Sequence, residues 1–431
     1  MPFRALHLKH LEALAVMENA TDLLVEASRL WTGTDKPPIT NGVVLVRAGK
    51  VVAAGTSAEV LPLARANPQI FRYPGKTLIP GLIDCHVHLC FPGHGIPAHE
   101  FMHNTTDLQV LLTAAGNAQA SLKQGVTTVR DVGSKDLLVL ELRDAIAAGR
   151  LQGCRVVASG PPITPTGGHM WYLGGQADSP EEIQQVSRRN WRAGADFLKI
   201  VGNGGGTPRT FSFIPNYTEF ELAAAVREAN EHSTHITIHA NHTETIRRAV
   251  AAGVHGIEHC TFLSGRGAVQ FDARLADEIA SKRIVIGHTL QAAYWSLRED
   301  SEHYSQMTVA ETAAADQSRR VTEQQTENFG RLRALGVIIV ASTDAGWRKN
   351  RFGLDYPLCL ELAVDAGMSN TEALLSGTRE AAKAIGRGES LGTLETGKVA
   401  DLVVVEGDPF QNISAVRLVA AVMKDGNWVT E

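Results

Sequence analysis

The two ends of the chain share a pattern of short apolar runs separated by turn residues. Residues 23–31 (LLVEASRLW) and 43–55 (VVLVRAGKVVAAG) follow this pattern, and so does the segment 392–431. Glycine-containing turns at residues 48–50 and 424–427 divide runs rich in β-branched residues, which is typical of β-hairpins. Neither end alone has enough strands to bury a sheet face, so we expect both to pair in one small β-sandwich.

Between these ends, apolar strand-like runs alternate with helical patterns of about 15 residues. The candidate strands lie at residues 78–89, 125–133, 154–161, 195–204, 235–241, 253–260, 283–290 and 337–346. The candidate helices lie at residues 107–123, 136–148, 180–193, 218–232, 243–252, 272–282, 318–335 and 370–385. This alternation predicts an α/β fold, a (β/α)₈ TIM barrel with the β-sandwich attached. The expected parts are an N-terminal extension (1–21), the sandwich (22–77 plus 388–431) and the barrel (78–387).

Three of the expected helices begin with recognisable capping residues. Thr218 precedes Glu221 in the spacing of a capping box, and Thr106 stands before another helical run. Ser179 is followed by a proline, which is favoured in the first turn of a helix. These residues predict where three barrel helices start.

Composition and charge narrow the classes of partner. The chain of 431 residues is 44% hydrophobic and 20% charged, an ordinary composition for a folded protein with a sizeable core. Its formal net charge of -5 provides no broad cationic surface, so we expect no nucleic-acid partner and no anionic membrane partner. No apolar run reaches the roughly 18 residues of a membrane span, so we expect a soluble protein. The five cysteines include no CxxC pair, which argues against structural zinc and thioredoxin-like chemistry.

The first 20 residues do not have the pattern of a secretion signal. Lys9, His10 and Glu12 interrupt the apolar stretch, and no small-residue cleavage site follows it. We therefore expect an appended helix here and a cytoplasmic protein. A secreted or periplasmic protein is the alternative if the native N-terminus differs.

Metal-binding residue types stand at the ends of five candidate strands. They are His86, His88, Lys199, His239, His259 and Asp344. Active sites of (β/α)₈ barrels form at the C-terminal ends of the strands, where these side chains would meet. His86 and His88 are two residues apart on one strand and therefore share a face. Because imidazole and carboxylate groups bind zinc and similar ions, we expect a metal centre at the barrel mouth.

Lys199 requires a separate explanation, because two nearby dications repel an ammonium group. A neutral lysine amine can react with carbon dioxide to give a carbamate, whose two oxygens could bridge two metals. The alternative is an ordinary lysine that pairs with Asp196 or extends its amine toward solvent. The residues alone leave both interpretations open.

The segments IPGLIDCHVHL, FLKIV, ITIHAN, GIEHC and ASTDAG resemble the metal-binding motifs of the amidohydrolase superfamily. The resemblance implies that His86, His88 and Asp344 hold one divalent metal, with zinc as the expected ion. It implies that His239 and His259 hold a second metal and that carboxylated Lys199 bridges the two. It also implies a catalytic role for Asp344, which would take a proton from the attacking water and deliver it to the leaving amine.

The same resemblance narrows the reaction. Deaminases and imidazolonepropionases of the superfamily generally use one metal and lack the bridging lysine, so FLKIV favours hydrolysis of an amide, lactam or ester. The segments TPTGGHM, KIVGNGGGTPR and IPNYTEFEL resemble enzymes that cleave N-acyl amino acids and Xaa-Pro dipeptides, including ochratoxin-degrading amidohydrolases. A homo-oligomer is implied as well, with an octamer as one candidate size. The alternatives are a cyclic-amide or lactone hydrolase and, outside the enzymes, a non-catalytic barrel.

Such enzymes release a C-terminal amino acid, so the expected substrate carries a free carboxylate that needs donors. The candidates follow strands three, four and seven and are His169, Arg209, Tyr217 and His288. A purely structural role is the alternative for each of them. The glycine run at 204–206 lacks the flanking pattern of a phosphate-binding loop, so we expect no nucleotide cofactor.

Overall fold

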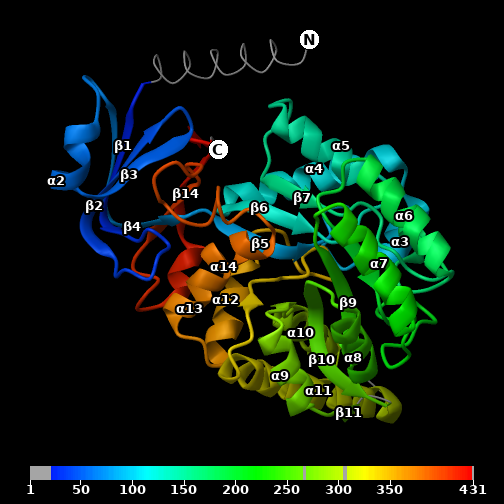
Figure 1. Ribbon diagram of the computed structural model, residues 1–431. Helices are drawn as coiled ribbons and strands as arrows, with labels where there is room; N and C mark the ends of the chain where they lie inside the picture. The colour runs from blue at the N-terminus through cyan, green and yellow to red at the C-terminus, as the bar shows by residue number, and fades with distance from the viewer. Residues whose placement is uncertain (1–20, 266–267, 304–307, 430–431) are drawn as a thin grey trace, which may run out of the picture.

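The computed structural model describes residues 21–265, 268–303 and 308–429. Figure 1 shows a β-sheet unit at the left and a larger unit of strands and helices beside it. The extension predicted at residues 1–21 lies outside the described residues, apart from Thr21. In the described part of the chain, every helix is too short or too polar to cross a bilayer.

Strands from both ends of the chain form one seven-stranded sheet, in the order β16-β15-β14-β4-β1-β2-β3. They are β1 (Leu23–Leu30), β2 (Ile39–Arg47), β3 (Lys50–Thr56), β4 (Gln69–Pro80), β14 (Leu402–Glu406), β15 (Val419–Lys424) and β16 (Asn427–Trp428). β4 pairs in parallel with β1 and antiparallel with β14, so it joins the two ends of the chain. The prediction that both ends build one β unit is therefore confirmed.

This sheet is rolled, so that its two halves enclose a shared apolar core. The edge strand β3 hydrogen bonds to residues 397–400, which lead into β14. For example, Val51 N donates to Lys398 O at 2.9 Å. The two predicted glycine turns meet there, because a Cβ on Gly426 would lie 2.5 Å from Gly49 Cα. The domain boundaries at 77/78 and 387/388 stay a prediction.

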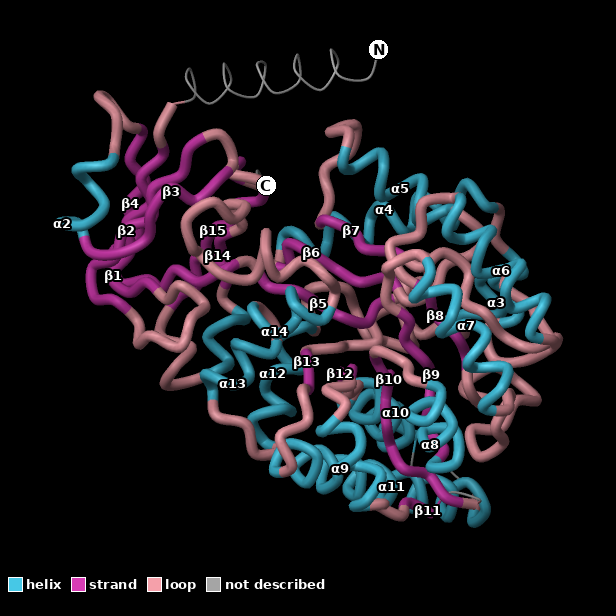
Figure 2. The backbone as a smooth tube through the Cα atoms, in the orientation of Figure 1, coloured by secondary structure: helices cyan, strands magenta, loops and turns pink. Residues whose placement is uncertain are grey.

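Eight parallel strands follow, each within or overlapping one predicted run. They are β5 (Leu82–Val87), β6 (Val126–Asp131), β7 (Arg155–Ala158), β8 (Leu198–Val201), β9 (Ile236–His242), β10 (Gly256–Ser264), β12 (Val285–Gly287) and β13 (Ile339–Val340). β5 to β7 form one hydrogen-bonded sheet, and β8 to β13 form another to which the short β11 (Ala268–Val269) is added. Backbone bonds join the two sheets at both seams: Asp196 N donates to Ala158 O at 2.8 Å, and Cys85 N to Ala341 O at 2.9 Å. The strands thus close a (β/α)₈ barrel (Figure 2).

Helices cover the outside of the barrel strands (Figure 2). Those at predicted positions are α4 (Asp107–Lys123), α5 (Leu138–Ala147), α6 (Pro180–Arg192), α7 (Glu219–Glu231), α8 (Thr243–Ala252), α9 (Ala273–Ser281), α11 (Val309–Ala334), α13 (Asn370–Ser376) and α14 (Arg379–Ala384). The predicted caps are confirmed: the side chains of Thr106, Ser179 and Thr218 each accept a backbone hydrogen bond at the start of their helices.

The structure differs from the prediction in a few helices. The helix expected at 370–385 is divided at Gly377, where a Cβ would overlap the Tyr356 hydroxyl. The helix expected at 318–335 starts earlier, at Val309. Residues 309–317 are mostly good helix formers, but they lack the apolar period from which the helix was predicted. Further helices are α2 (Ser57–Val60), α3 (Ala98–Asn104), α10 (Leu290–His303) and α12 (Tyr356–Asp365).

Candidate metal centre and its cavity

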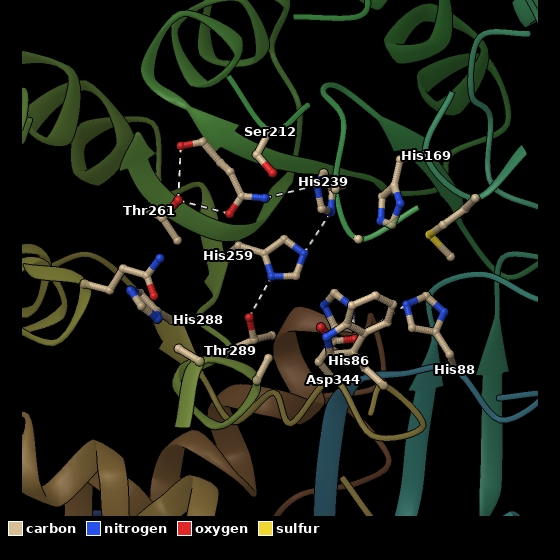
Figure 3. Close-up of a pocket in the computed structure, with 18 of the residues that line it drawn as sticks. His86, His88, His169, Ser212, His239, His259, Thr261, His288, Thr289 and Asp344 are labelled. Carbon is tan, nitrogen blue, oxygen red and sulfur yellow. Dashed lines mark hydrogen bonds and ion pairs between the residues drawn. The ribbon is translucent and has the colours of Figure 1, made fainter. Parts of the chain in front are cut away.

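A cavity of about 270 Å³ lies at the C-terminal ends of the barrel strands. All six predicted metal ligands line it, together with His169 and His288. Figure 3 shows the labelled histidines around one cavity, with His288 on the opposite side of His259 from His88. The strand ends therefore bring together side chains that are far apart in the sequence, as the barrel prediction requires.

His86 and His88 are oriented by hydrogen bonds on their Nδ1 atoms. His86 Nδ1 lies 2.8 Å from Glu258 Oε2, and His88 Nδ1 lies 2.9 Å from Gly133 O. Their Nε2 atoms both face Asp344 Oδ1, at 3.5 and 3.7 Å respectively. Burial lowers the pKa of His86 well below its usual value and that of His88 to about 3, so both imidazoles are neutral. Two neutral imidazoles and a carboxylate thus converge on one point, as ligands of a divalent metal do.

Asp344 is held beside His86 by its own backbone. Its N–H donates to His86 O at 2.9 Å, and its φ of 59° lies in the left-handed region that non-glycine residues rarely adopt. His259 has a φ of 71°, so two of the converging residues carry this strain. Backbone strain of this kind concentrates at functional sites. Burial raises the pKa of Asp344 to about 7, which suits a group that accepts and returns a proton.

His239 and His259 face each other on neighbouring strands. His239 Nδ1 lies 2.9 Å from His259 Nε2, and two zinc-bound nitrogens in a tetrahedral site lie about 3.3 Å apart. The remaining ring nitrogens also have partners: His259 Nδ1 is 2.6 Å from Thr289 Oγ1, and His239 Nε2 is 3.0 Å from Asn241 Nδ2. Outer contacts of this kind orient metal-binding histidines, so the pair fits a second metal.

Lys199 lies beneath these rings and is only 1% exposed. Its Nζ makes no ion pair or hydrogen bond with the described residues, while Asp196 is bound instead by Arg143 and Arg387, each at 2.8 Å. The pairing of Lys199 with Asp196 is therefore not what the structure contains. Burial lowers the pKa of Lys199 to about 8, opposed by the nearby carboxylates Glu258 and Asp344. A buried lysine without a partner is costly as an ammonium ion and less so as a neutral amine.

Glu258, a buried carboxylate inside the barrel, was not predicted from the sequence. Besides His86, it accepts hydrogen bonds from Arg130 Nη2 at 2.6 Å and Thr237 Oγ1 at 2.5 Å. Gly287 leaves room for it, since a Cβ there would overlap Oε2. The available signal was an acidic residue inside the apolar run GIEHC, because unpaired charges are not buried in strands.

Two predicted substrate contacts line the cavity. His169 Nδ1 lies 2.8 Å from Thr207 Oγ1, and its ring faces His239 at a centroid distance of 4.9 Å. Both ring nitrogens of His288 lack a hydrogen-bond partner among the described residues, although the side chain is 4% exposed. Buried polar groups are nearly always satisfied, so the ring nitrogens of His288 are available to bind a group in the cavity.

The other two predicted contacts do not reach the cavity. Tyr217 is buried beneath α7 and donates its hydroxyl hydrogen to Ala177 O at 2.8 Å. Arg209 is exposed and is not part of the lining. Among the described residues, Lys199 is thus the sole lysine or arginine that lines the cavity. The rest of the lining is mixed: its polar side chains include Ser212, Asn241, Thr261, Thr289 and Gln325, and its apolar ones include Phe91, Met170, Leu263 and Trp347.

Comparison with known proteins adds a family relationship. Residues 77–429 match the model of the Amidohydrolase family. This range includes the barrel, all six converging residues and the C-terminal strands of the rolled sheet.

Individual relatives cover nearly the whole chain. Ochratoxinase from Aspergillus niger is 25% identical over 93% of this chain and 84% of its own length. Imidazolonepropionase from Aromatoleum aromaticum is 28% identical over 89% and 90%, respectively. Among solved structures, a Xaa-Pro dipeptidase with methionine bound in its active site is 26% identical, with a TM-score of 0.82 over 95% of this chain and all of that one.

Proposed function

This chain belongs to the amidohydrolase family, and on that premise we propose that it is a two-zinc enzyme that hydrolyses an amide bond to release a C-terminal amino acid. The observation that carries this proposal is the position of Lys199. It is buried next to four imidazoles and a carboxylate, and its Nζ forms no ion pair with the described residues. As a carbamate, a lysine at this position would supply an oxygen ligand to each of two metals.

The proposed ligand sets follow from the two convergences. His86, His88 and Asp344 would hold one metal, and His239 with His259 would hold the other. When bound, the metals would supply Lewis acidity, which activates a water molecule and polarises the scissile carbonyl. A carbamate, Asp344 and a hydroxide would together offset three of the four positive charges of two dications, which would leave about one positive charge.

Asp344 is the proposed proton carrier. Its carboxylate faces the cavity and lies within 3.7 Å of both His86 Nε2 and His88 Nε2. In this role it accepts a proton from the attacking water and donates it to the leaving nitrogen, so that the amine departs neutral. In the metal-free cavity, burial raises the pKa of this carboxyl to about 7, and a bound dication would hold it lower.

The substrate class is inferred from the relatives and the cavity together. The relatives include an ochratoxinase and a Xaa-Pro dipeptidase with methionine bound in its active site. We assign the carboxylate of such a substrate to His288 and His169, which line the cavity together with the polar side chains of Ser212, Asn241 and Gln325. Trp347 and Phe91 provide apolar wall for its side chain. The candidate substrates are N-acyl phenylalanine, a Xaa-Pro dipeptide and ochratoxin A, which would give ochratoxin alpha and phenylalanine.

The test combines metal analysis with a panel of substrates. Purified protein should contain about two zinc ions per chain, chelation should abolish hydrolysis and zinc should restore it. The panel contains N-acetyl-phenylalanine, ochratoxin A, Ala-Pro, a hydantoin and imidazolone propionate. Hydrolysis of a linear amide supports the proposal. Turnover of the hydantoin alone would establish the cyclic-amide alternative. Turnover of imidazolone propionate alone would favour the activity for which the imidazolonepropionase relatives are named.

The variant Lys199→Ala separates the bridging role from general stability. It should bind fewer than two metals and lose at least about 100-fold in kcat while remaining folded by circular dichroism. Lys398→Ala is a matched control, because this lysine donates to Leu391 O and Gly388 O outside the metal centre. Full metal content in the Lys199 variant would contradict the proposed bridge.

A further inference from the structure

A second cavity, of about 460 Å³, opens at the opposite end of the barrel. Its lining comes from residues that precede β8, β9, β10, β12 and β13, together with α14. In a parallel barrel these are the N-terminal ends of the strands, so the cavity lies across the barrel from the metal centre. It is therefore separate from the site described above.

Arg130 forms the inner end of this cavity. Its side chain is 7% exposed, and two of its three nitrogens are bonded: Nε donates to Cys85 O at 2.6 Å and Nη2 to Glu258 Oε1 at 2.6 Å. Nη1 has no hydrogen-bond partner among the described residues, and it retains some solvent-accessible surface. Arg130 also lines a smaller adjoining cavity, so this buried guanidinium presents free donors to an open space.

The rim of the cavity carries an excess of cations. Lys282, Arg283 and Lys383 line it, whereas Glu380 is the sole carboxylate in the described lining. Glu380 is itself bound by Lys383 at 3.1 Å and by Arg379 at 2.7 Å. The exposed Arg283 makes no ion pair with the described residues. This local excess stands out in a chain whose formal net charge is -5.

We propose that this cavity binds a small oxyanion, the phosphate or carboxylate group of a metabolite, on Arg130. A guanidinium with a free edge binds planar and tetrahedral oxyanions through strong charge-assisted hydrogen bonds. Arg283 and Lys282 supply the outer charges, and the apolar floor around Phe197 accommodates the carbon part of the ligand. The volume admits a ligand larger than inorganic phosphate.

The position of Arg130 also connects the cavity to the metal centre. The contacts run from Arg130 to Glu258 at 2.6 Å and from Glu258 to His86 at 2.8 Å. An anion on Nη1 acts on the same guanidinium that orients Glu258. The site is thereby only two hydrogen bonds away from a residue of the metal centre.

Isothermal titration of the zinc-loaded enzyme with inorganic phosphate, and separately with succinate, tests the proposal. We expect saturable binding of at least one anion, weakened at least about tenfold in Arg283→Ala. Arg274→Ala is the matched control, because this exposed arginine lies at the far end of α9 and is not part of the lining. Its binding should equal that of the unmodified enzyme.

A third variant distinguishes the two ends of the barrel. Asp344→Asn disables the metal centre and should leave anion binding intact. If phosphate binds more tightly than succinate, the natural ligand of this cavity carries a phosphate group. If succinate binds more tightly, the ligand carries a carboxylate. The proposal is overturned if neither anion binds saturably. It is equally overturned if binding survives in Arg283→Ala and disappears in Asp344→Asn, because the anion then occupies the metal centre.

Discussion

Glu258 Oε2 lies 2.8 Å from His86 Nδ1, and the two side chains are each 1% exposed. Because Nδ1 donates to the carboxylate, the lone pair of His86 is left on Nε2, which faces Asp344. Contacts of this kind raise the basicity of a ligating imidazole and fix its orientation. Glu258 is thus a positioning residue for the proposed metal centre.

Replacement of Glu258 should weaken metal binding without removing a ligand. For Glu258→Gln we expect the affinity for zinc to fall about 10-fold to 100-fold, because the amide cannot satisfy the donors of His86, Arg130 and Thr237 equally well. Competition with a chromogenic chelator measures this affinity directly. Glu228→Gln is the matched control: Glu228 is also buried, but it pairs with Arg188 at 2.7 Å outside the metal centre. Equal zinc affinity in both variants would contradict the positioning role.

Much of the fold was predictable because the strands and helices of a barrel alternate in a pattern that is visible in short stretches of sequence. The eight apolar runs and the helix caps at Thr106, Ser179 and Thr218 depend on neighbours in the sequence, and the structure contains them all. The convergence of His86 with Asp344 was predictable for a different reason. Once parallel strands close a barrel, their C-terminal ends must share one rim.

The parts that were not predicted depend on contacts between distant residues. Glu258 and His86 are 172 positions apart, and although an acidic residue inside the run GIEHC is unusual, no local pattern indicates that it pairs with His86. Tyr217 was expected in the cavity, yet its hydroxyl reaches Ala177 O instead, because the loop before α7 turns it toward α6. Side-chain direction within a loop follows from packing that the sequence does not display.

His288 provides a prediction in which stability and substrate affinity change in opposite directions. Its two ring nitrogens are buried and unpaired, and its ring meets Phe329 edge to face at 5.2 Å. His288→Phe removes the unsatisfied groups and keeps the aromatic contact, so the free energy of unfolding should increase by about 1 kcal/mol. The KM for the best linear amide should rise, while kcat changes less. Urea denaturation and steady-state kinetics measure the two effects, and an unchanged KM would argue against a substrate contact.

Gly206 and Trp347 should control the shape of the cavity. A Cβ on Gly206 would overlap the indole ring of Trp347, and both residues line the cavity. In Gly206→Ala the ring must move, so we expect KM to rise at least about fivefold with the zinc content unchanged. Gly116→Ala is the control, since nothing lies within 4 Å of a Cβ at that position in α4. If both alanine variants retain the normal KM, Trp347 does not shape the binding site.

The rolled sheet supplies a prediction about acid stability that is independent of the metal centre. Asp22 has a fully buried side chain that accepts hydrogen bonds from Arg47 Nε at 2.6 Å, Arg47 Nη2 at 2.7 Å and Arg65 N at 2.7 Å. The hydrogen bonds from Arg47 hold the pKa of Asp22 below its usual value, and burial opposes this only in part. The folded state therefore favours the ionised carboxylate more strongly than the unfolded state does.

The sign of the pH dependence follows from this lowered pKa. The stabilisation is fully present above the unfolded pKa of about 3.9 and is lost as the pH falls through the lower folded value. At pH 7, Asp22→Asn should reduce the free energy of unfolding by about 2 kcal/mol. The difference from the unmodified protein should begin to shrink near pH 4, where the carboxyl of the unfolded chain takes up a proton, and should vanish only below the lower pKa of the folded state. Urea denaturation between pH 7 and pH 3 measures this convergence, and Asp35→Asn, whose side chain is 83% exposed, should have little effect. A constant difference at all pH values would show that packing of the side chain, rather than its charge, stabilises this part of the sheet.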